Sequence, residues 1–318
     1  REIKSIGGIA GYINELIKFS LTHGLKIGFV GKIFNYSKES KIDYIQTQEY
    51  VTSTNKFLVS LFMNSLKVNL PKDALIHAHR PDHLAAFTLF NNRPSIITIH
   101  GQQALTINIR KGKLVRNIYK VLEKVAVRRA KALIAVDPKT KEFYEKLHPK
   151  HKHKIHVIPT GVNTDLFMPL GYGNTREDLG ILNDDKVIIY VGRIEPPKKI
   201  QDIIKAVQIL IEEDPKYKLI LVGDGVQMEE MKELVKSRSL QNNIQFLGVR
   251  KSTELPQLYS ASNVSILLSG NEGSPLSVKE SLACGVPVVA NDVGDIKSVI
   301  KDDFNGFVVD DQNTVEIV

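Results

Sequence analysis

The sequence predicts an α/β protein built from two Rossmann-like, doubly wound domains, each with a parallel sheet covered by helices. Apolar runs of strand length alternate with segments of helical period along the whole chain, which is typical of parallel strands joined by helical crossovers. The runs are apolar on both faces, as in strands buried between two layers of helices. A chain of 318 residues is long enough for two such domains, which we expect to face one another across a cleft.

Continuous apolar runs indicate the strands, and an apolar period near 3.6 residues indicates the helices. In the first half we expect strands at 24–31, 74–79, 95–101, 132–137 and 154–161. In the second half we expect strands at 186–193, 217–225, 243–248, 264–269, 286–292 and 306–309. Helices are expected between them at 8–22, 82–90, 114–130, 138–147, 200–213, 226–238, 253–261, 275–284 and 295–301.

The domain boundary is predicted in the stretch 158–174, which is rich in Pro, Gly and Asn. The charge also changes sign there, since residues 1–160 hold 27 Lys and Arg against 11 Asp and Glu, and residues 161–318 hold 16 against 24. We therefore place the domains at 1–165 and 166–318. Both ends look incomplete, because no full strand precedes the first helix and a final helix is cut short.

Composition limits the classes of protein to consider. Hydrophobic residues at 42% and charged residues at 25% are typical of soluble globular proteins, and the lack of a long apolar run predicts no membrane span. The single cysteine, Cys284, excludes an internal disulfide and a Cys-based zinc site, and we expect it to be buried. The basic first half predicts an anionic partner, such as a membrane surface, a phosphate-bearing substrate or nucleic acid, unless it is simply a solvated surface.

Two glutamates stand eight positions apart in the stretch "SGNEGSPLSVKESLACGVPVVANDVG" at 269–294. Glu272 follows a strand, and Ser274 and Pro275 are expected as the N-cap and first residue of a helix that carries Glu280. A helix N-terminus offers free N–H groups and a positive dipole end to a diphosphate. Carboxylates accept paired hydrogen bonds from neighbouring sugar hydroxyls. The pattern favours a nucleotide-sugar site, with solvated surface glutamates as the alternative.

Two cations follow another strand of the second half, in "YVGRIEPPKKI" at 190–200. Arg193 and Lys198 are expected in the loop at the carboxyl end of that strand, where open parallel sheets bind ligands. They would neutralise a diphosphate and the charge that grows as it leaves. Taken alone they are equally consistent with surface charges.

Seven segments occur in the order found in one enzyme family. They are "GGIAGYINELIKF", "ITIHG", "IPTGVNTDLF", "VGRIEPPKKIQDIIKA", "LVGDG", "FLGVRKSTELPQLYSASNVSILLS" and "NEGSPLSVKESLACGVPVVANDVGDI". The chain therefore resembles the family 4 retaining glycosyltransferases of GT-B fold, over nearly its whole length and most densely from 155 to 309.

The resemblance implies a role for each matching position. Glu280 corresponds to the glutamate that binds the ribose, Glu272 to the one that contacts the donor sugar, and Arg193 and Lys198 to the diphosphate pair. His100 corresponds to a histidine that faces the transferred sugar. The implied catalytic residues are thus Arg193, Lys198, Glu272 and His100, and the implied donor-binding residues are Gly7, Gly8, Gly273, Ser274, Pro275, Leu276, Glu280 and Val249.

The sequence departs from the family at three places. Lys199 stands where the family usually has Gly, which leaves open whether Lys198 or Lys199 contacts the diphosphate. Ser274 and Pro275 replace the commoner Phe-Gly, a variant familiar in members that build polysaccharides. Asn163 stands where Asp is frequent.

Histidines and a basic helix are further candidates. His100 alone is equally consistent with a structural role, and His77, His79 and His83 lack the carboxylate or cysteine that would complete a metal site, so we expect them in the wall of the cleft or the core. In the segment 109–133, an apolar face and a separate stripe of lysine and arginine are compatible with contact with anionic lipid or an anionic acceptor, the alternative being an ordinary surface helix that packs on its own sheet. The expected apolar residues are Leu114, Val115, Ile118, Leu122, Val125 and Ala126.

The resulting hypothesis is a cytoplasmic retaining glycosyltransferase, at the inner face of a membrane, that moves a sugar from a nucleotide diphosphate to the hydroxyl of a glycan or lipid-linked acceptor. The first domain would serve the acceptor and the second the nucleotide sugar, with UDP slightly favoured over GDP, no metal or other cofactor, and no nucleic acid partner. A non-enzymatic binder of anionic membranes or nucleic acid is the alternative. A phosphorylase, hydrolase or epimerase on a similar scaffold is also open, whereas the lack of Gly-x-Gly-x-x-Gly disfavours a dinucleotide oxidoreductase.

Overall fold

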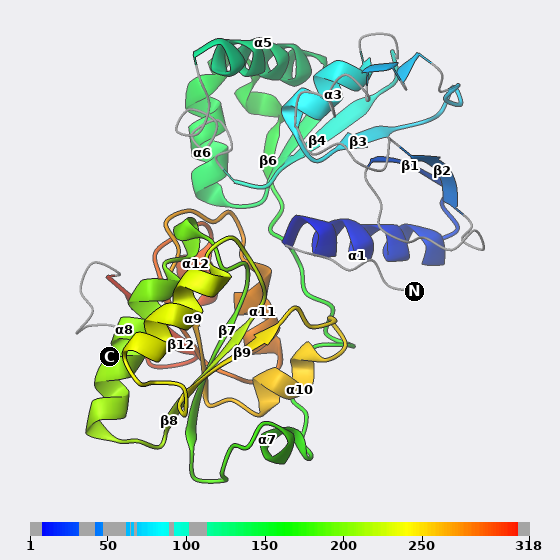
Figure 1. The fold of residues 1–318 in the computed structure, drawn as a ribbon. Helices are drawn as coiled ribbons and strands as arrows, with labels where there is room; N and C mark the ends of the chain where they lie inside the picture. Colours follow the sequence, from blue (N-terminus) through cyan, green and yellow to red (C-terminus); the bar gives the residue numbers. More distant parts are fainter. Residues whose placement is uncertain are drawn as a thin grey trace. The chain divides into compact units, whose positions relative to one another are not determined.

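The structure, a computed structural model, describes residues 8–31, 42–46, 62–63, 65–66, 69–88, 92–101 and 113–310. Apart from its first few residues, the chain forms one compact unit up to Pro159 and a second from Thr160 onward (Figure 1). This boundary lies inside the stretch 158–174. Each unit contains a parallel sheet with helices against it, so the predicted class of two parallel-sheet α/β domains is confirmed.

The first unit is built on a four-stranded parallel sheet. Its strand order is β3 (Ile76–Ala78), β4 (Ser95–Ile99), β5 (Ala132–Ala135) and β6 (Ile155–Val157). Helices α3 (Pro81–Thr88), α5 (Lys113–Arg129) and α6 (Pro138–Leu147) contribute side chains to the core around this sheet, among them Leu84, Ala126 and Tyr144. Other elements among the described residues of the unit are α1 (Gly8–Thr22), β1 (Ile27–Gly31), β2 (Ile42–Gln46) and the 3₁₀-helix η1 (Pro149–Lys154).

Strand β2 was not predicted, although it pairs in parallel with β1. Its sequence, IDYIQ, is interrupted by Asp43 and so lacks the continuous apolar run by which the other strands were found. The short helix α7 (Thr175–Asp178) and the 3₁₀-helices at Pro149–Lys154 and Pro196–Lys198 were also missed, because one or two turns carry no helical period.

The predicted apolar face of α5 is divided in the structure. Ala126 is in the core and Leu122 and Val125 pack against it, whereas Ile118 is 50% exposed and its neighbour Tyr119 is buried, as is Glu123. The hydroxyl of Tyr144 donates a hydrogen bond to Oε1 of Glu123 at 2.8 Å, which satisfies the buried carboxyl. Glu123 interrupts the apolar pattern of the helix, so its burial cannot be predicted from the sequence.

The second unit contains a six-stranded parallel sheet in the order β12-β11-β10-β7-β8-β9. The strands are β7 (Lys186–Val191), β8 (Tyr217–Val222), β9 (Ile244–Gly248), β10 (Val264–Leu267), β11 (Val288–Asn291) and β12 (Gly306–Val309). The helices are α7, α8 (Ile200–Glu213), α9 (Met228–Ser237), α10 (Leu255–Ser260), α11 (Leu276–Ala283) and α12 (Ile296–Val299), with the 3₁₀-helix η2 (Pro196–Lys198).

Two separate cores cover the two faces of this sheet. Ile188 and Tyr190 of β7 pack into a cluster with α8, α9 and α12, and the alternate residues Val187 and Ile189 pack into another with α10 and residues at the end of α11. This explains why the strand sequences are apolar throughout. Cys284 is buried in the second cluster, as expected, and burial raises the pKa of its thiol to about 11, so it stays a protonated packing residue.

The strand order reverses between β7 and β10. From β7 the chain proceeds outward through β8 and β9, and then returns to place β10 on the other side of β7, followed by β11 and β12. Loops that leave adjacent strands on the two sides of such a reversal diverge and open a crevice at the carboxyl ends of the strands. The loops after β7 and β10 therefore occupy the position where open sheets of this kind bind ligands.

Candidate active site

The loops after β7 and β10 are joined by a largely buried ion pair. Nζ of Lys198, in the single turn η2, donates a hydrogen bond to Oε1 of Glu272, and the two side chains are only 13% and 16% exposed. The backbone N–H of Gly270 and the hydroxyl of Ser269 also donate to the carbonyl of Pro197, at 2.7 and 3.1 Å. Two predicted site residues 74 positions apart are thus brought together.

Arg193 lies in the same loop but is not part of this pair. Its Nη1 donates to Oε2 of Glu195 at 2.8 Å, and its side chain is 49% exposed. Its carbonyl accepts a hydrogen bond from the hydroxyl of Tyr190 at 2.8 Å, which anchors the loop to β7. The guanidinium is therefore held at the surface by an acid that the sequence did not single out.

The start of α11 differs from the prediction. The helix begins at Leu276, Pro275 occupies the N-cap position with φ −69° and ψ 117°, and no side chain caps it. Ser274, predicted as the N-cap, instead donates from its hydroxyl to Oδ2 of Asp295 at 2.7 Å. The hydroxyl is drawn away by a charged acceptor, which leaves the first-turn N–H groups of α11 without a side-chain partner.

A buried charged cluster explains where Ser274 is held. Nζ of Lys279 donates to Oδ2 of Asp295 at 2.8 Å, to Oγ of Ser274 at 2.5 Å and to the carbonyl of Thr160 at 2.7 Å. The Lys279 and Asp295 side chains are 11% and 1% exposed. This cluster was not predicted from the sequence, in which its only signal is a lysine next to Glu280 whose partner lies sixteen residues away.

Gly294 brings the loop after β11 against the loop that carries Glu272. Its φ is +56°, and a Cβ atom placed on it would lie 1.8 Å from the carbonyl oxygen of Gly273. The backbone N–H of Asp295 donates to the same oxygen at 3.0 Å. Only glycine fits this approach, which fixes Gly273 and, through it, the start of α11.

Glu280 contacts α10 rather than the ion pair. Its Oε2 accepts a hydrogen bond from the hydroxyl of Tyr259 at 3.3 Å, and the side chain is half-buried. Burial raises the pKa of Glu280 to about 7, against the opposing effect of the Tyr259 hydroxyl. Near neutral pH this carboxyl is therefore shared between its acid and its anion.

Val249 and Arg250 follow β9. Val249 is 46% exposed, and Arg250 makes a surface pair with Glu254 at 3.4 Å. Because β8 separates β9 from β7, this loop is one strand removed from the reversal of strand order.

Lys199 adopts a left-handed backbone conformation, with φ 48° and ψ 40°, at the start of α8. The family resemblance implies glycine at this position, and a left-handed backbone is the conformation that glycine adopts most readily. Lys198, by contrast, is the residue paired with Glu272.

Lys199→Gly is expected to stabilise the protein by up to about 1 kcal/mol, because it relieves the left-handed strain of a residue with a Cβ atom. Urea unfolding would measure the change. Ser239→Gly is the matched control, since Ser239 has φ 57° at the end of α9 and should gain a similar amount. A lower unfolding midpoint for Lys199→Gly together with a higher one for Ser239→Gly would contradict the expectation.

The first unit places four aromatic rings together. Nδ1 of His79 lies 3.1 Å from Nε2 of His100, Nε2 of His77 lies 2.7 Å from Oγ1 of Thr98, and the ring of Tyr12 is edge-on to His79 and His100. Burial lowers the pKa of His79 to about 3 and that of His100 to about 4, so both rings are neutral. In the described part of the chain, no group of three or more His, Cys, Asp or Glu residues is arranged to hold a metal ion.

The remaining predicted residues lie at the N-terminal end. Gly8 is the first residue of α1, and Gly7 lies outside the described residues. Among all the residues that the structure describes, no helix has the length and apolar character needed to span a membrane.

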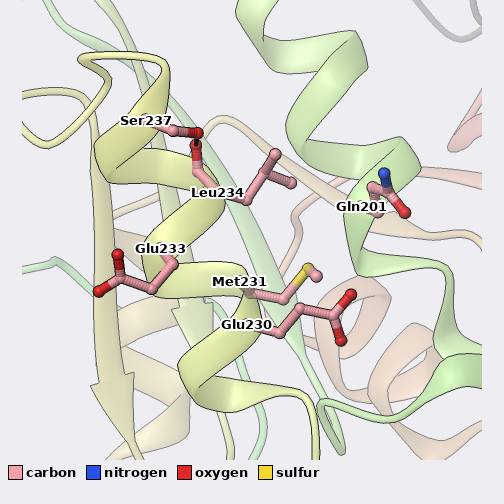
Figure 2. Close-up of a pocket in the computed structure, with 6 residues that line it drawn as sticks. All are labelled: Gln201, Glu230, Met231, Glu233, Leu234 and Ser237. Atoms are coloured by element: carbon pink, nitrogen blue, oxygen red, sulfur yellow. Dashed lines mark hydrogen bonds between the residues drawn. The ribbon is translucent and has the colours of Figure 1, made fainter.

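A shallow groove of about 360 Å³ lies between α8 and α9 (Figure 2). Gln201 of α8 lines it on one side, and α9 supplies the rest: Glu230, Met231, Glu233, Leu234 and Ser237. None of the predicted site residues lies there. The groove follows the packing of two helices and does not sit at the carboxyl ends of strands.

Two family models match the chain in succession. Residues 6–166 match the model described as Glycosyltransferase Family 4, and residues 172–318 match the one described as Glycosyl transferases group 1. The chain belongs to glycosyltransferase family 4. This confirms the resemblance to family 4 glycosyltransferases, whereas the retaining mode stays a prediction.

Curated relatives of this family 4 chain carry different names. It is 30% identical over 218 residues to the Escherichia coli UDP-Gal:alpha-D-GlcNAc-diphosphoundecaprenol alpha-1,3-galactosyltransferase, covering 67% of the chain and 55% of the relative. It is 29% identical over 182 residues to the alpha-monoglucosyldiacylglycerol synthase of Acholeplasma laidlawii, covering 55% and 44%. The chain thus spans about half the length of the curated relatives it matches.

Solved structures share the fold of this family 4 chain. WaaG, a glycosyltransferase involved in lipopolysaccharide biosynthesis, aligns with a TM-score of 0.81 at 16% identity over 98% of this chain and 86% of its own. Sucrose-phosphate synthase from Thermosynechococcus elongatus aligns at 0.78 and 22% identity over 98% and 84%. Anabaena HepE in complex with UDP and glucose aligns at 0.69 and 22% identity over 87% and 74%.

Proposed function

We propose that this chain is a retaining glycosyltransferase that moves a sugar from a nucleotide diphosphate to an acceptor hydroxyl. The observation that carries the proposal is the Lys198–Glu272 pair, which joins the loops after β7 and β10 at the reversal of strand order. The uncapped start of α11 follows Glu272 by four residues. A cation, a carboxylate and a helix N-terminus together match a diphosphate linked to a sugar.

The ion pair supports a simple account of donor binding. A diphosphate would take Lys198 from Glu272, because two phosphate charges attract the ammonium group more strongly than one carboxylate. Glu272 would then be free to accept hydrogen bonds from the donor sugar. Glu280, on the following helix, would accept hydrogen bonds from the ribose. Its raised pKa disfavours the anion, and hydrogen bonds from the ribose hydroxyls would offset the lost water and favour ionisation.

The proposed reaction is a front-side displacement. The acceptor oxygen bonds to the anomeric carbon on the face from which the diphosphate leaves, as the bond from that carbon to the phosphate oxygen breaks. The departing phosphate oxygen takes the proton of the acceptor hydroxyl. Lys198, Arg193 and the first turn of α11 stabilise the negative charge on the leaving group, and this lowers the barrier.

The donor is proposed to carry UDP in preference to GDP. Solved neighbours include HepE bound to UDP and to UDP-glucose, and one curated relative is named for UDP-Gal. Val249 would contact the base mainly through its backbone. The nucleotide-diphosphate sugar would serve as the co-substrate, and no cofactor is proposed.

The acceptor is proposed to be lipid-linked, at the inner face of a membrane. The exposed side of α5 presents Ile118 and Val121, 50% and 61% exposed, beside the exposed Lys120 and Lys124. Apolar side chains flanked by lysines suit the surface of an anionic bilayer. Two relatives whose names contain diphosphoundecaprenol and glucosyldiacylglycerol support this proposal.

Ile118→Ser with Val121→Ser is expected to weaken binding to vesicles of anionic phospholipid about tenfold or more, since each exposed apolar side chain contributes of the order of 1 kcal/mol on insertion. Sedimentation with vesicles measures it. Leu147→Ser, an exposed position at the end of α6, is the control and should bind like the wild type. Equal binding by the double variant and the wild type would refute the proposal that this side of α5 binds the membrane.

Incubation of the protein with UDP- and GDP-sugars and lipid-linked or soluble acceptors tests the function. Thermal shift with UDP and GDP selects the donor, and NMR of the product assigns the anomeric configuration. Transfer with retention is the expected result. Transfer with inversion, or salt-sensitive binding of lipid or nucleic acid without turnover of any donor, would overturn the proposal.

A further inference from the structure

The contact between His79 and His100 is specific in its atoms. Nδ1 of His79 lies 3.1 Å from Nε2 of His100, and the two residues follow the neighbouring parallel strands β3 and β4. A hydrogen bond between two imidazole nitrogens needs a proton on one and a lone pair on the other. The protonation patterns of the two rings are therefore coupled.

We propose that His79 is a positioning residue that determines which ring nitrogen of His100 carries the proton. This inference rests on the proposed function and on the role that the family resemblance implies for His100, that of a histidine facing the transferred sugar. His79 acts through His100 and is not assigned a contact with substrate.

The surroundings of His79 hold its ring in place. The ring of His77 lies 4.5 Å from it on one side, with its own Nε2 2.7 Å from the hydroxyl of Thr98. The ring of Tyr12 meets His79 edge-on at 5.7 Å and His100 at 5.1 Å. With both neighbours in contact, rotation of the His79 ring is restricted, so its Nδ1 stays directed at His100.

Two arrangements of the protons are possible for neutral rings. If Nδ1 of His79 donates, Nε2 of His100 accepts and His100 carries its proton on Nδ1, where it can donate to a sugar oxygen. If Nε2 of His100 donates, its Nδ1 is an acceptor. The lowered pKa values of both rings, caused mainly by burial, keep them neutral and so keep this coupling intact.

The test compares three variants by long-range ¹H–¹⁵N NMR of the histidines and by steady-state kinetics. His79→Phe keeps a ring but removes the hydrogen bond. His79→Asn restores it, because the side-chain amide atoms stand as many bonds from Cα as Nδ1 does. His77→Phe is the control, because Nε2 of His77 contacts the hydroxyl of Thr98 and not His100.

His79→Phe is expected to turn the single tautomer of His100 into a mixture and to lower kcat about ten- to a hundredfold, with the donor KM within about twofold. His79→Asn should restore both, and His77→Phe should leave both near the wild type. An unchanged His100 tautomer in His79→Phe, or an equal loss in His77→Phe, overturns the inference. Absence of transfer by the wild type would refute the proposed function instead, while the NMR comparison would still decide the coupling.

Discussion

Lys198→Met is expected to lower kcat for sugar transfer by about 10²–10³, the cost of losing one charged group aimed at charge that develops in the transition state. The effect should fall on kcat more than on the donor KM, because the negative charge on the diphosphate grows as the bond to the sugar breaks. Initial rates over a range of donor concentrations separate the two constants. The prediction depends on the contact that Lys198 makes with Glu272 across the two loops.

A control must separate this effect from the loss of the ion pair itself. Glu272→Gln removes the partner charge but leaves Lys198 in place, so it should weaken contact with the donor sugar while keeping the diphosphate contact. Lys205→Met, at a half-exposed lysine of α8, should leave the rate unchanged. A rate for Lys198→Met within twofold of the wild type would show that this lysine does not act on the leaving group.

Asp295→Ala is expected to destabilise the protein by about 3–5 kcal/mol, because it leaves the ammonium group of Lys279 largely buried without a counter-charge. The same change removes the acceptor that draws the Ser274 hydroxyl away from α11. We therefore expect weaker nucleotide binding as well as lower stability. Urea unfolding followed by circular dichroism measures the first effect, and thermal shift with UDP the second.

The double variant Lys279→Met, Asp295→Leu should recover most of the lost stability, since an apolar pair of similar size leaves no buried charge. Breaking the exposed pair of Lys146 with Glu142 by Glu142→Ala is the control and should leave the stability nearly unchanged. A loss below 1 kcal/mol for Asp295→Ala would mean that water or a neighbouring group replaces the carboxylate.

The residues behind these two predictions differ in whether the sequence alone could indicate them. Lys198 and Glu272 could be found because each follows an apolar strand, and polar residues at strand ends are sparse enough to stand out. Lys279 and Asp295 could not, because one sits on a helix and the other in a loop, and nothing local marks a buried ion pair. Ser274 was assigned to the helix cap for the same reason, since a distant carboxylate competes for its hydroxyl.

The sequence alone determined the two parallel-sheet domains, the positions of most strands and helices and the loops that carry the polar residues. The reason is that burial on both faces of a strand gives a local, continuous apolar run. Only the tertiary structure decided that Lys198 meets Glu272, that Ser274 binds Asp295 and that Tyr119 rather than Ile118 of α5 faces the core. These outcomes depend on strand order and on buried polar partners far apart in the chain, and the free energy of such contacts has no local signature.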